Sequence, residues 1–196
     1  MNGAAGDPAA GDPAAGAPAA DAPAASLTLR PLGPSDAPRY RALRLAALAA
    51  FPHAFRPDHA EALQQPLAWA ERRLATDGEH WFGAFDGDAL VGAICLRTQA
   101  GNKIRHSASL NALVVDPARQ ARGIGSALVA YLIAQARALG HVRQLTLTVH
   151  EGNARAERLY DAFGFRTFGL EPAAFLHDGV YYAKQHRQLI LASDDT

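Results

Sequence analysis

A glycine-containing loop between a predicted strand and a predicted helix constrains the fold of this chain more than any other feature. The apolar run up to Val115 is followed by Asp116 and Pro117, and Gly123 and Gly125 open a helical apolar pattern. A helix start leaves about four backbone N–H groups without intrahelical partners and carries the positive end of the helix dipole. Glycines let a ligand approach the bare backbone. The segment therefore predicts an anion site that suits a diphosphate.

Two common phosphate-binding loops fit this segment poorly. A Walker loop needs a lysine and then Ser or Thr after its last glycine, but Ser126 follows Gly125 directly and no lysine is near. A dinucleotide-binding loop needs a small residue where this chain has Leu128, and an acidic residue about 20 positions further on, where it has Leu145. The Walker interpretation fails and the dinucleotide interpretation is weak.

A second segment, residues 153–165, fits a short helix that is followed at once by a strand. Asn153 is a favourable N-cap, and Gly164 stands where a left-handed C-cap belongs. The apolar side chains of one helical face recur at spacings of three and four: Ala156, Leu159 and Phe163.

These two segments together resemble the GNAT superfamily of acyl-CoA-dependent N-acetyltransferases, and within it a bacterial subgroup of mostly uncharacterised members. The first segment has its loop pattern, Gln/Arg-x-x-Gly-x-Gly/Ala, at Gln120, Gly123 and Gly125. The second has its order of Asn, Ala, Leu-Tyr and Gly-Phe. The resemblance covers nearly all of residues 26–192. It implies an α/β fold with a mixed, mostly antiparallel sheet of about seven strands, whose central strands splay, and flanking helices.

The resemblance implies acetyl-CoA as cosubstrate, held between the splayed strands. It assigns the pyrophosphate to the loop and helix start, made of Gln120, Ala121, Arg122, Gly123, Ile124, Gly125 and Ser126. It assigns the pantetheine arm to the backbone of Leu113, Val114 and Val115, and Asn153 is expected to contact the same arm. A backbone N–H near Leu113 is expected to face the acetyl carbonyl. Tyr160 would be the general acid, because a phenol with a pKa of roughly 10 can protonate the departing thiolate.

The general base is less well defined by the sequence. Many members of the superfamily carry a glutamate on the strand before the loop, whereas residues 107–115 contain no carboxylate. We take His106 as the candidate, because an imidazole with a pKa of about 6.5 can accept a proton directly or through water. Glu61, Glu151, Glu171 and a water chain are alternatives.

We therefore expect an enzyme that moves an acetyl group from acetyl-CoA to a primary amine of a small molecule or peptide, by direct attack in a ternary complex. The missing strand carboxylate keeps a second hypothesis open, a non-catalytic acyl-CoA-binding or sensing module. The acceptor is not identified by the motifs. Its site is expected to draw on an aromatic wall: Phe51, Phe55, Trp69, Phe175 and Tyr181.

The order of the remaining elements follows from apolar periodicity. A helix is predicted from a cap at Ser35 to about Phe51, with Tyr40, Leu43, Ala47 and Leu48 inward, and further helices at 66–74, from the loop to Gly140, and at 153–163. The last turn of the long helix is expected to place Leu139 inward. Strands are predicted at 27–31, 81–85, 90–97, 107–115 and 145–149, from Phe165, and at about 180–190.

The rest of the composition excludes several classes of protein. Residues 6–25 repeat a five-residue unit rich in Ala, Pro, Gly and Asp, so residues 1–25 are expected to form a disordered tail before a domain at 26–192. That tail has no basic start and the chain has no apolar run of about 18 residues, which argues against a signal peptide and a membrane span.

Lys and Arg number 19, as do Asp and Glu, so no basic surface for nucleic acid is predicted.

Cysteine and histidine carry no further chemistry in this interpretation. Cys95 lies in an apolar strand pattern and is expected in the core. His150 and Glu151 begin like a zincin motif, but Ala154 stands where the second histidine is required, so no metal is expected. A cytoplasmic location is expected, and a homodimer is a reasonable oligomeric state.

Overall fold

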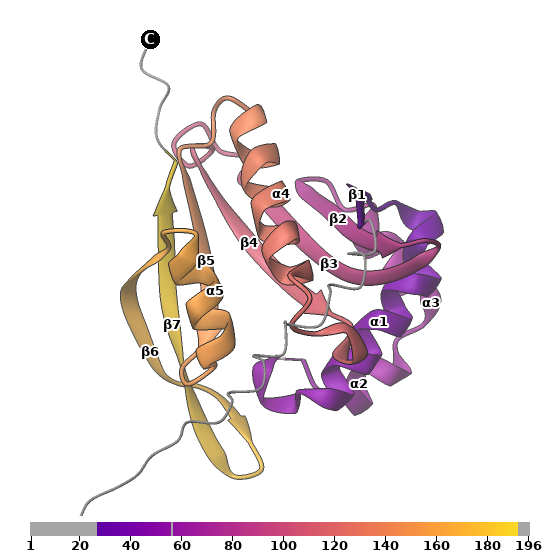
Figure 1. Ribbon diagram of the computed structural model, residues 1–196. Helices are drawn as coiled ribbons and strands as arrows, with labels where there is room; N and C mark the ends of the chain where they lie inside the picture. Colours follow the sequence, from indigo (N-terminus) through magenta and orange to yellow (C-terminus); the bar gives the residue numbers. More distant parts are fainter. Residues whose placement is uncertain (1–26, 56, 192–196) are drawn as a thin grey trace, which may run out of the picture.

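The computed structural model describes residues 27–55 and 57–191, so the tail expected at 1–25 lies outside the described residues (Figure 1). The strands are β1 (Thr28–Pro31), β2 (Glu79–Asp86), β3 (Ala89–Thr98), β4 (Ser107–Val115), β5 (Gln144–His150), β6 (Arg166–His177) and β7 (Val180–Ile190). The α-helices are α1 (Ala37–Ala50), α2 (His59–Gln64), α3 (Leu67–Leu74), α4 (Ile124–Ala138) and α5 (Ala154–Ala162). Short 3-10 turns are η1 (Pro34–Asp36), η2 (Pro52–Ala54) and η3 (Pro117–Arg119).

The strands form one seven-stranded sheet in the order β1-β2-β3-β4-β5-β7-β6. Neighbours are antiparallel except β4 and β5, which are parallel. The predicted mixed, mostly antiparallel sheet is therefore confirmed. The β4–β5 pairing is confined to Ser107–Ser109 against Gln144–Thr146, and beyond these residues the two strands part.

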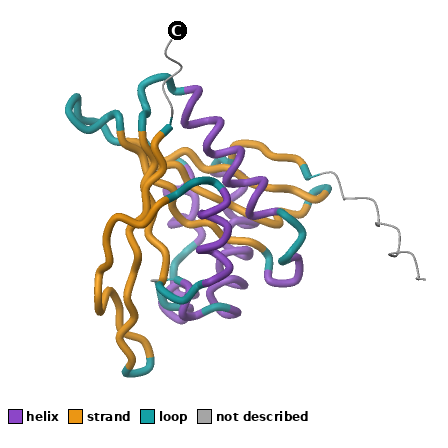
Figure 2. Tube along the Cα trace, turned by 60° about the vertical axis from the view of Figure 1, so that its left-hand side comes forward, coloured by secondary structure: helices purple, strands orange, loops and turns teal. Residues whose placement is uncertain are grey.

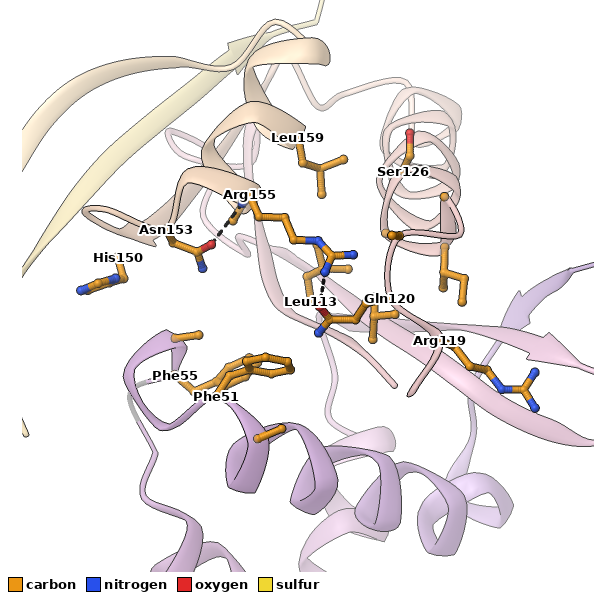
Figure 3. A pocket seen from close by; sticks show the side chains of 18 of the residues that line it. Phe51, Phe55, Leu113, Arg119, Gln120, Ser126, His150, Asn153, Arg155 and Leu159 are labelled. Carbon is orange, nitrogen blue, oxygen red and sulfur yellow. Dashed lines mark hydrogen bonds between the residues drawn. The ribbon is translucent and has the colours of Figure 1, made fainter. Parts of the chain in front are cut away.

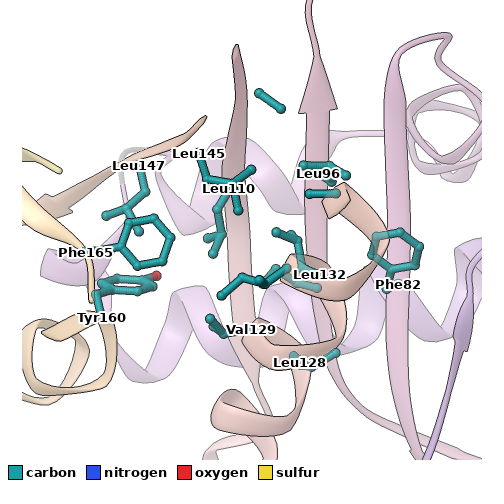
Figure 4. Close-up of a cluster of buried hydrophobic side chains, with 14 of the residues drawn as sticks. Phe82, Leu96, Leu110, Leu128, Val129, Leu132, Leu145, Leu147, Tyr160 and Phe165 are labelled. Carbon is teal, nitrogen blue, oxygen red and sulfur yellow. The ribbon is translucent and has the colours of Figure 1, made fainter. Parts of the chain in front are cut away.

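Helices cover both faces of the sheet. Helices α4 and α5 lie on one face, and α1, α2 and α3 lie on the other (Figures 1 and 2). The α4 face is sealed by a cluster of fully buried aliphatic and aromatic side chains that includes Leu128, Leu132, Leu145 and Phe165 (Figure 4). A second cluster joins α1 and α3 to the opposite face and includes Tyr40, Trp81 and Cys95. The expectation that Cys95 is a core residue is confirmed, and burial raises the pKa of its thiol to about 12.

The inward face predicted for the first helix is confirmed, since Tyr40, Leu43, Ala47 and Leu48 are all buried. The cap predicted at Ser35 is wrong, because this residue lies within η1 and α1 begins two residues later at Ala37.

Two other local expectations need correction. Helix α2 was not predicted; it begins after Asp58, whose carboxylate accepts hydrogen bonds from the N–H groups of Ala60 and Glu61. Leu139 is 36% exposed, because it lies at the end of α4, where the chain turns through Gly140.

The last two strands form a long hairpin. Its turn is Asp178-Gly179, with φ values of 48° and 75°. Positive φ at both central residues is typical of a type I′ turn, whose twist matches that of the flanking strands. The hairpin extends past the end of β5 and reaches below α2 in Figure 1.

Candidate functional site

A cavity of about 600 Å³ opens where β4 and β5 part (Figure 3). This volume is typical of small-molecule and cofactor sites. Its lining comes from both faces of the sheet. From the α4 side come Arg119, Gln120, Ala121, Gly123, Ile124, Gly125, Ser126, Asn153, Arg155, Ala156 and Leu159, and from the α1 side come Ala50, Phe51, Pro52, Ala54 and Phe55. Leu113, Val115 and His150, from the parting strands, complete it. The cavity therefore passes through the sheet.

The helix start predicted to hold an anion lies at this cavity. Helix α4 has Gly123 as its N-cap, with φ of 74°, and no side chain caps it. The first intrahelical bond of this turn runs from the Ala127 N–H to the Gly123 carbonyl, at 2.9 Å. The N–H groups of Ile124, Gly125 and Ser126 precede it and have no intrahelical acceptor. All three residues line the cavity, so these donors are available to an anionic ligand.

Two arginines bring positive charge to the same end. Arg119 pairs with Asp86 and lies 3.8 Å from a carboxylate oxygen of Asp116, so acidic partners already balance its charge. Arg155 donates a hydrogen bond to the side-chain oxygen of Gln120 (Figure 3). Arg155 was missed as a site residue, because it is 35 positions away from Gln120 in the sequence and only the folding of α5 against the loop brings the two together. Arg122 is exposed and does not line the cavity.

The parted section of β4 forms one wall of the cavity. Leu113 and Val115 line it, whereas Val114 points to the opposite face and is buried in the α1 cluster. A bulge in β4 precedes Leu113. The register against β3 shifts between Ala93 and Cys95, and Ala112 of β4 has a φ of 52°. Within the described part of the chain, β4 has no ladder partner on its β5 side beyond Ser109, so its backbone groups there are open to an extended ligand.

Helix α5 begins at the cavity and ends in the core. The Asn153 side-chain oxygen accepts the Ala156 N–H at 3.1 Å, which confirms the predicted N-cap and leaves the amide nitrogen of Asn153 as a donor. Tyr160 is 6% exposed, does not line the cavity, and packs edge-on against Phe165. Its hydroxyl points toward Leu110, which immediately follows the last paired residue of β4 (Figure 4). Burial raises the pKa of Tyr160, so the phenol stays protonated.

The structure does not bring His106 to this cavity. His106 precedes β4 at its far end, and its carbonyl accepts the N–H of Arg143. Seven strand residues at about 3.3 Å each separate it from Leu113, roughly 23 Å in all. The alternatives Glu61, Glu151 and Glu171 do not line the cavity either.

His150 does line the cavity, although the sequence singled it out only as part of a failed metal motif. Its position could have been found from strand alternation. Leu145, Leu147 and Val149 are buried under α4, so His150, one residue further along β5, faces the other side of the sheet.

The expected aromatic wall is only partly present. Phe51 and Phe55 line the cavity, and Phe175 lies close to it, stacked on Tyr182 and 5.7 Å from the His150 ring. Trp69 packs instead against the α1 cluster, between the guanidinium groups of Arg44 and Arg73. Tyr181 is 68% exposed.

Among residues 27–55 and 57–191, no group of three His, Cys, Asp or Glu side chains is arranged to hold a metal ion. Within the same part of the chain, the helices are too short or too polar to cross a bilayer.

Comparisons with known proteins agree with this geometry. The family model described as "Acetyltransferase (GNAT) family" matches residues 41–165. Among curated proteins, N-alpha-acetyltransferase RimI of Mycobacterium tuberculosis is 36% identical over 105 residues, which are 54% of this chain and 63% of that protein. The chain thus spans less than two thirds of this relative.

Solved structures share the fold. The acetyltransferase of GNAT family from Streptococcus pneumoniae superposes with a TM-score of 0.76 at 23% identity, covering 85% of this chain and all of that one. The protein yncA from Salmonella typhimurium, solved with its cofactor acetyl-CoA, superposes with a TM-score of 0.69 at 20% identity, covering 87% of this chain and 97% of that one. At these identities the likeness concerns the fold.

Proposed function

Because this chain belongs to the acetyltransferase (GNAT) family, we propose that it transfers an acetyl group from acetyl-CoA to a primary amine of a small molecule or peptide. The observation that carries the proposal is the cavity that crosses the sheet where β4 and β5 part. A donor can enter it from the α4 face and an acceptor from the α1 face, so both can meet without a covalent acetyl-enzyme. We assign this activity to a domain of residues 26–192.

The donor half follows from the groups at the α4 end. The N–H groups of Ile124, Gly125 and Ser126 would hold the pyrophosphate, with Arg155 near it. The pantetheine amides would pair with the open backbone around Leu113 and with the side-chain amide of Asn153. That yncA was solved with acetyl-CoA supports this choice of donor.

The chemical step needs a polarised carbonyl and a proton for the leaving thiolate. A backbone N–H near Leu113 would stabilise the oxyanion that forms when the amine nitrogen attacks the acetyl carbon. The carbon–sulfur bond then breaks and the thiolate takes a proton from Tyr160, whose hydroxyl points toward Leu110 of β4 in Figure 4. The raised pKa of Tyr160 suits an acid that must be protonated before the step.

Ligand binding at the α4 end is tested by comparing Gly125→Glu with Gly125→Gln. A Cβ at Gly125 would meet Leu159 at 3.5 Å, an ordinary contact, so both variants should fold. Glutamate places a negative charge beside the diphosphate, and glutamine of the same size does not. At 100 times its Kd, acetyl-CoA should stabilise the wild type by about 2.7 kcal/mol. The thermal shift should disappear in Gly125→Glu and survive in part in Gly125→Gln; an equal shift in all three proteins would refute the pyrophosphate site.

The competing function, a non-catalytic acyl-CoA-binding or sensing module, is favoured by the absence of a carboxylate on β4. Release of the coenzyme A thiol across a panel of amines separates the two functions. Tyr160→Phe should lower the turnover number by about 10² and leave the Kd of acetyl-CoA unchanged. Thiol release from the wild type that matches the buffer rate with every amine, although acetyl-CoA binds, would select the sensing module.

A further inference from the structure

We infer that His150 is the catalytic base, and that the acceptor subsite beside it selects primary amines of low basicity carried on an apolar or aromatic group. This inference rests on the proposed acetyltransferase function. It adds the proton acceptor and the acceptor class, neither of which the motifs supply.

His150 is distinguished first by the chemistry of the cavity wall. Among the described residues that line the cavity, the ionisable side chains are Arg119, Arg155 and His150. The two guanidinium groups stay protonated at any physiological pH and accept no proton. Among these described lining residues, the His150 imidazole is therefore the side chain that can accept a proton.

The face on which His150 lies is the one required for an acceptor. Strand alternation directs His150 away from the α4 core and toward the side that carries Phe51 and Phe55. Figure 3 shows His150 far from Ser126 and Arg119, at the opposite end of the cavity from the proposed pyrophosphate site. An amine that enters from the α1 face would meet His150 before it reaches the acetyl carbon.

Two aromatic rings of the β6–β7 hairpin pack beside the imidazole. The ring centroid of His150 lies 5.7 Å from that of Phe175 and 5.1 Å from that of Tyr182. Among the described residues, the ionisable groups near it include Tyr182 of β7, its ladder partner Lys184, Glu151 directly after it, and Arg155 of α5. The β6–β7 hairpin therefore packs against His150, the last residue of β5.

The same wall indicates the acceptor class. Among the described residues, the lining around the acceptor end is Ala50, Phe51, Pro52, Ala54 and Phe55, and none of these carries a carboxylate that could bind a second cation. An α-amine has a pKa of about 7.7–8.0 and a lysine amine one of about 10.4. Near neutral pH a far larger share of an α-amine than of a lysine amine is therefore already neutral, so a weak base such as imidazole suits the less basic amine.

The proton balance of the reaction is complete with these groups. His150 takes one proton from the ammonium, and the neutral nitrogen then forms a bond to the acetyl carbon as the carbon–sulfur bond breaks. Tyr160 gives its proton to the departing thiolate, and the second proton lost by nitrogen passes through water to restore the phenol. The imidazolium returns its proton to water.

The role of His150 is tested by the pH–rate profile of His150→Gln. We expect kcat/KM to fall by about 10² or more at pH 7 and the acidic limb of the profile to disappear, while the Kd of acetyl-CoA stays within twofold. His141→Gln is the matched control, since that ring bonds to the carbonyl of Leu139 beyond the end of α4. An acidic limb retained in His150→Gln, or lost instead in His106→Gln, would overturn the assignment.

The acceptor class is tested on the wild-type protein, independently of how any variant folds. Thiol release should be at least tenfold faster with a peptide amide that has a free N-terminal phenylalanine than with Nα-acetyl-lysine amide or spermidine at equal concentration. Faster release with either of the latter would refute this subsite and leave the acetyltransferase function intact. Thiol release that stays at the buffer rate with every amine would instead refute the acetyltransferase function.

Discussion

At the scale of single residues, backbone conformations outside the usual range occur on both sides of the cavity. Ala112 in the β4 bulge and Ala121 in the loop have φ of 52° and 64°. The left-handed region costs a residue with a side chain about 1–2 kcal/mol. Such strain persists where the surrounding structure imposes it, often at functional sites. At Ala121 the imposed shape is the turn that directs the α4 N–H groups into the cavity.

Ala121→Gly should therefore raise the free energy of unfolding, by about 0.5–1 kcal/mol, because glycine adopts this conformation without strain but loses more chain entropy on folding. Urea unfolding measures the change. The matched control is Ala127→Gly within α4, where the helical backbone suits alanine and a loss of about 1 kcal/mol is expected. If both variants lost stability equally, the loop would not be strained at Ala121.

At the scale of elements, one buried arginine helps to attach α5 to β7. Arg187 of β7 is 5% exposed and donates hydrogen bonds to the Asp161 carboxylate at 2.9 Å and to the Glu157 carbonyl at 3.2 Å. Tyr160 is the buried residue of α5, and Ala156 and Leu159 pack partly buried against the same cluster. Because α5 carries both Asn153 at its start and Tyr160, its attachment positions both residues.

Arg187→Met should lower the free energy of unfolding by about 2 kcal/mol, since it keeps most of the apolar stem but removes hydrogen bonds made by a charged group. Hydrogen exchange should accelerate in α5 more than in α4, which has its own buried core. Arg166→Met, at an exposed position on β6, is the control and should change stability by less than about 0.5 kcal/mol. Equal exchange in α5 of both variants would show that Arg187 does not hold the helix.

At the scale of the whole molecule, an ion pair joins the edge strand β1 to η1, directly before α1. The Arg30 guanidinium donates two hydrogen bonds to Asp36, at 2.8 and 2.9 Å, and the Gly33 N–H donates a third at 3.1 Å. The hydrogen bond from Arg30 is the main cause that holds the pKa of Asp36 below its usual value. The Asp36 side chain is 6% exposed and the Arg30 side chain 43% exposed, so solvent partly screens this contact.

A lowered carboxyl pKa stabilises the fold above the unfolded-state pKa, and this contribution is lost as the pH falls through the folded-state value. We expect thermal stability to decline on acidification below about pH 4. Asp36→Asn should lower the free energy of unfolding by about 1–2 kcal/mol at pH 7. The stability of this variant should then decline less steeply than that of the wild type as the pH falls. Asp88→Asn, in the exposed turn between β2 and β3, serves as the control. An unchanged acid decline in Asp36→Asn would rule out this pair as its source.

Local signals in the sequence predicted much of the fold. The bounds of β4, the Asn153 cap and the positive φ of Gly164 follow from steric and capping rules that act within a few residues. Short elements without periodicity were harder to predict: α2 has six residues and depends on the Asp58 cap. The exposure of Leu139 was missed because periodicity does not show where a helix stops contacting its sheet.

The sequence by itself determined the family and the loop at Gly123 and Gly125, because a helix start that can hold a diphosphate needs only neighbouring residues. Tertiary structure decided which residues share the cavity. It removed His106, placed at the paired end of β4, and brought His150 from the open end of β5 toward Phe51. The reason is physical. Long-range contacts and the β4 bulge decide where the two parallel strands stop pairing, and the apolar periodicity of either strand does not predict that position.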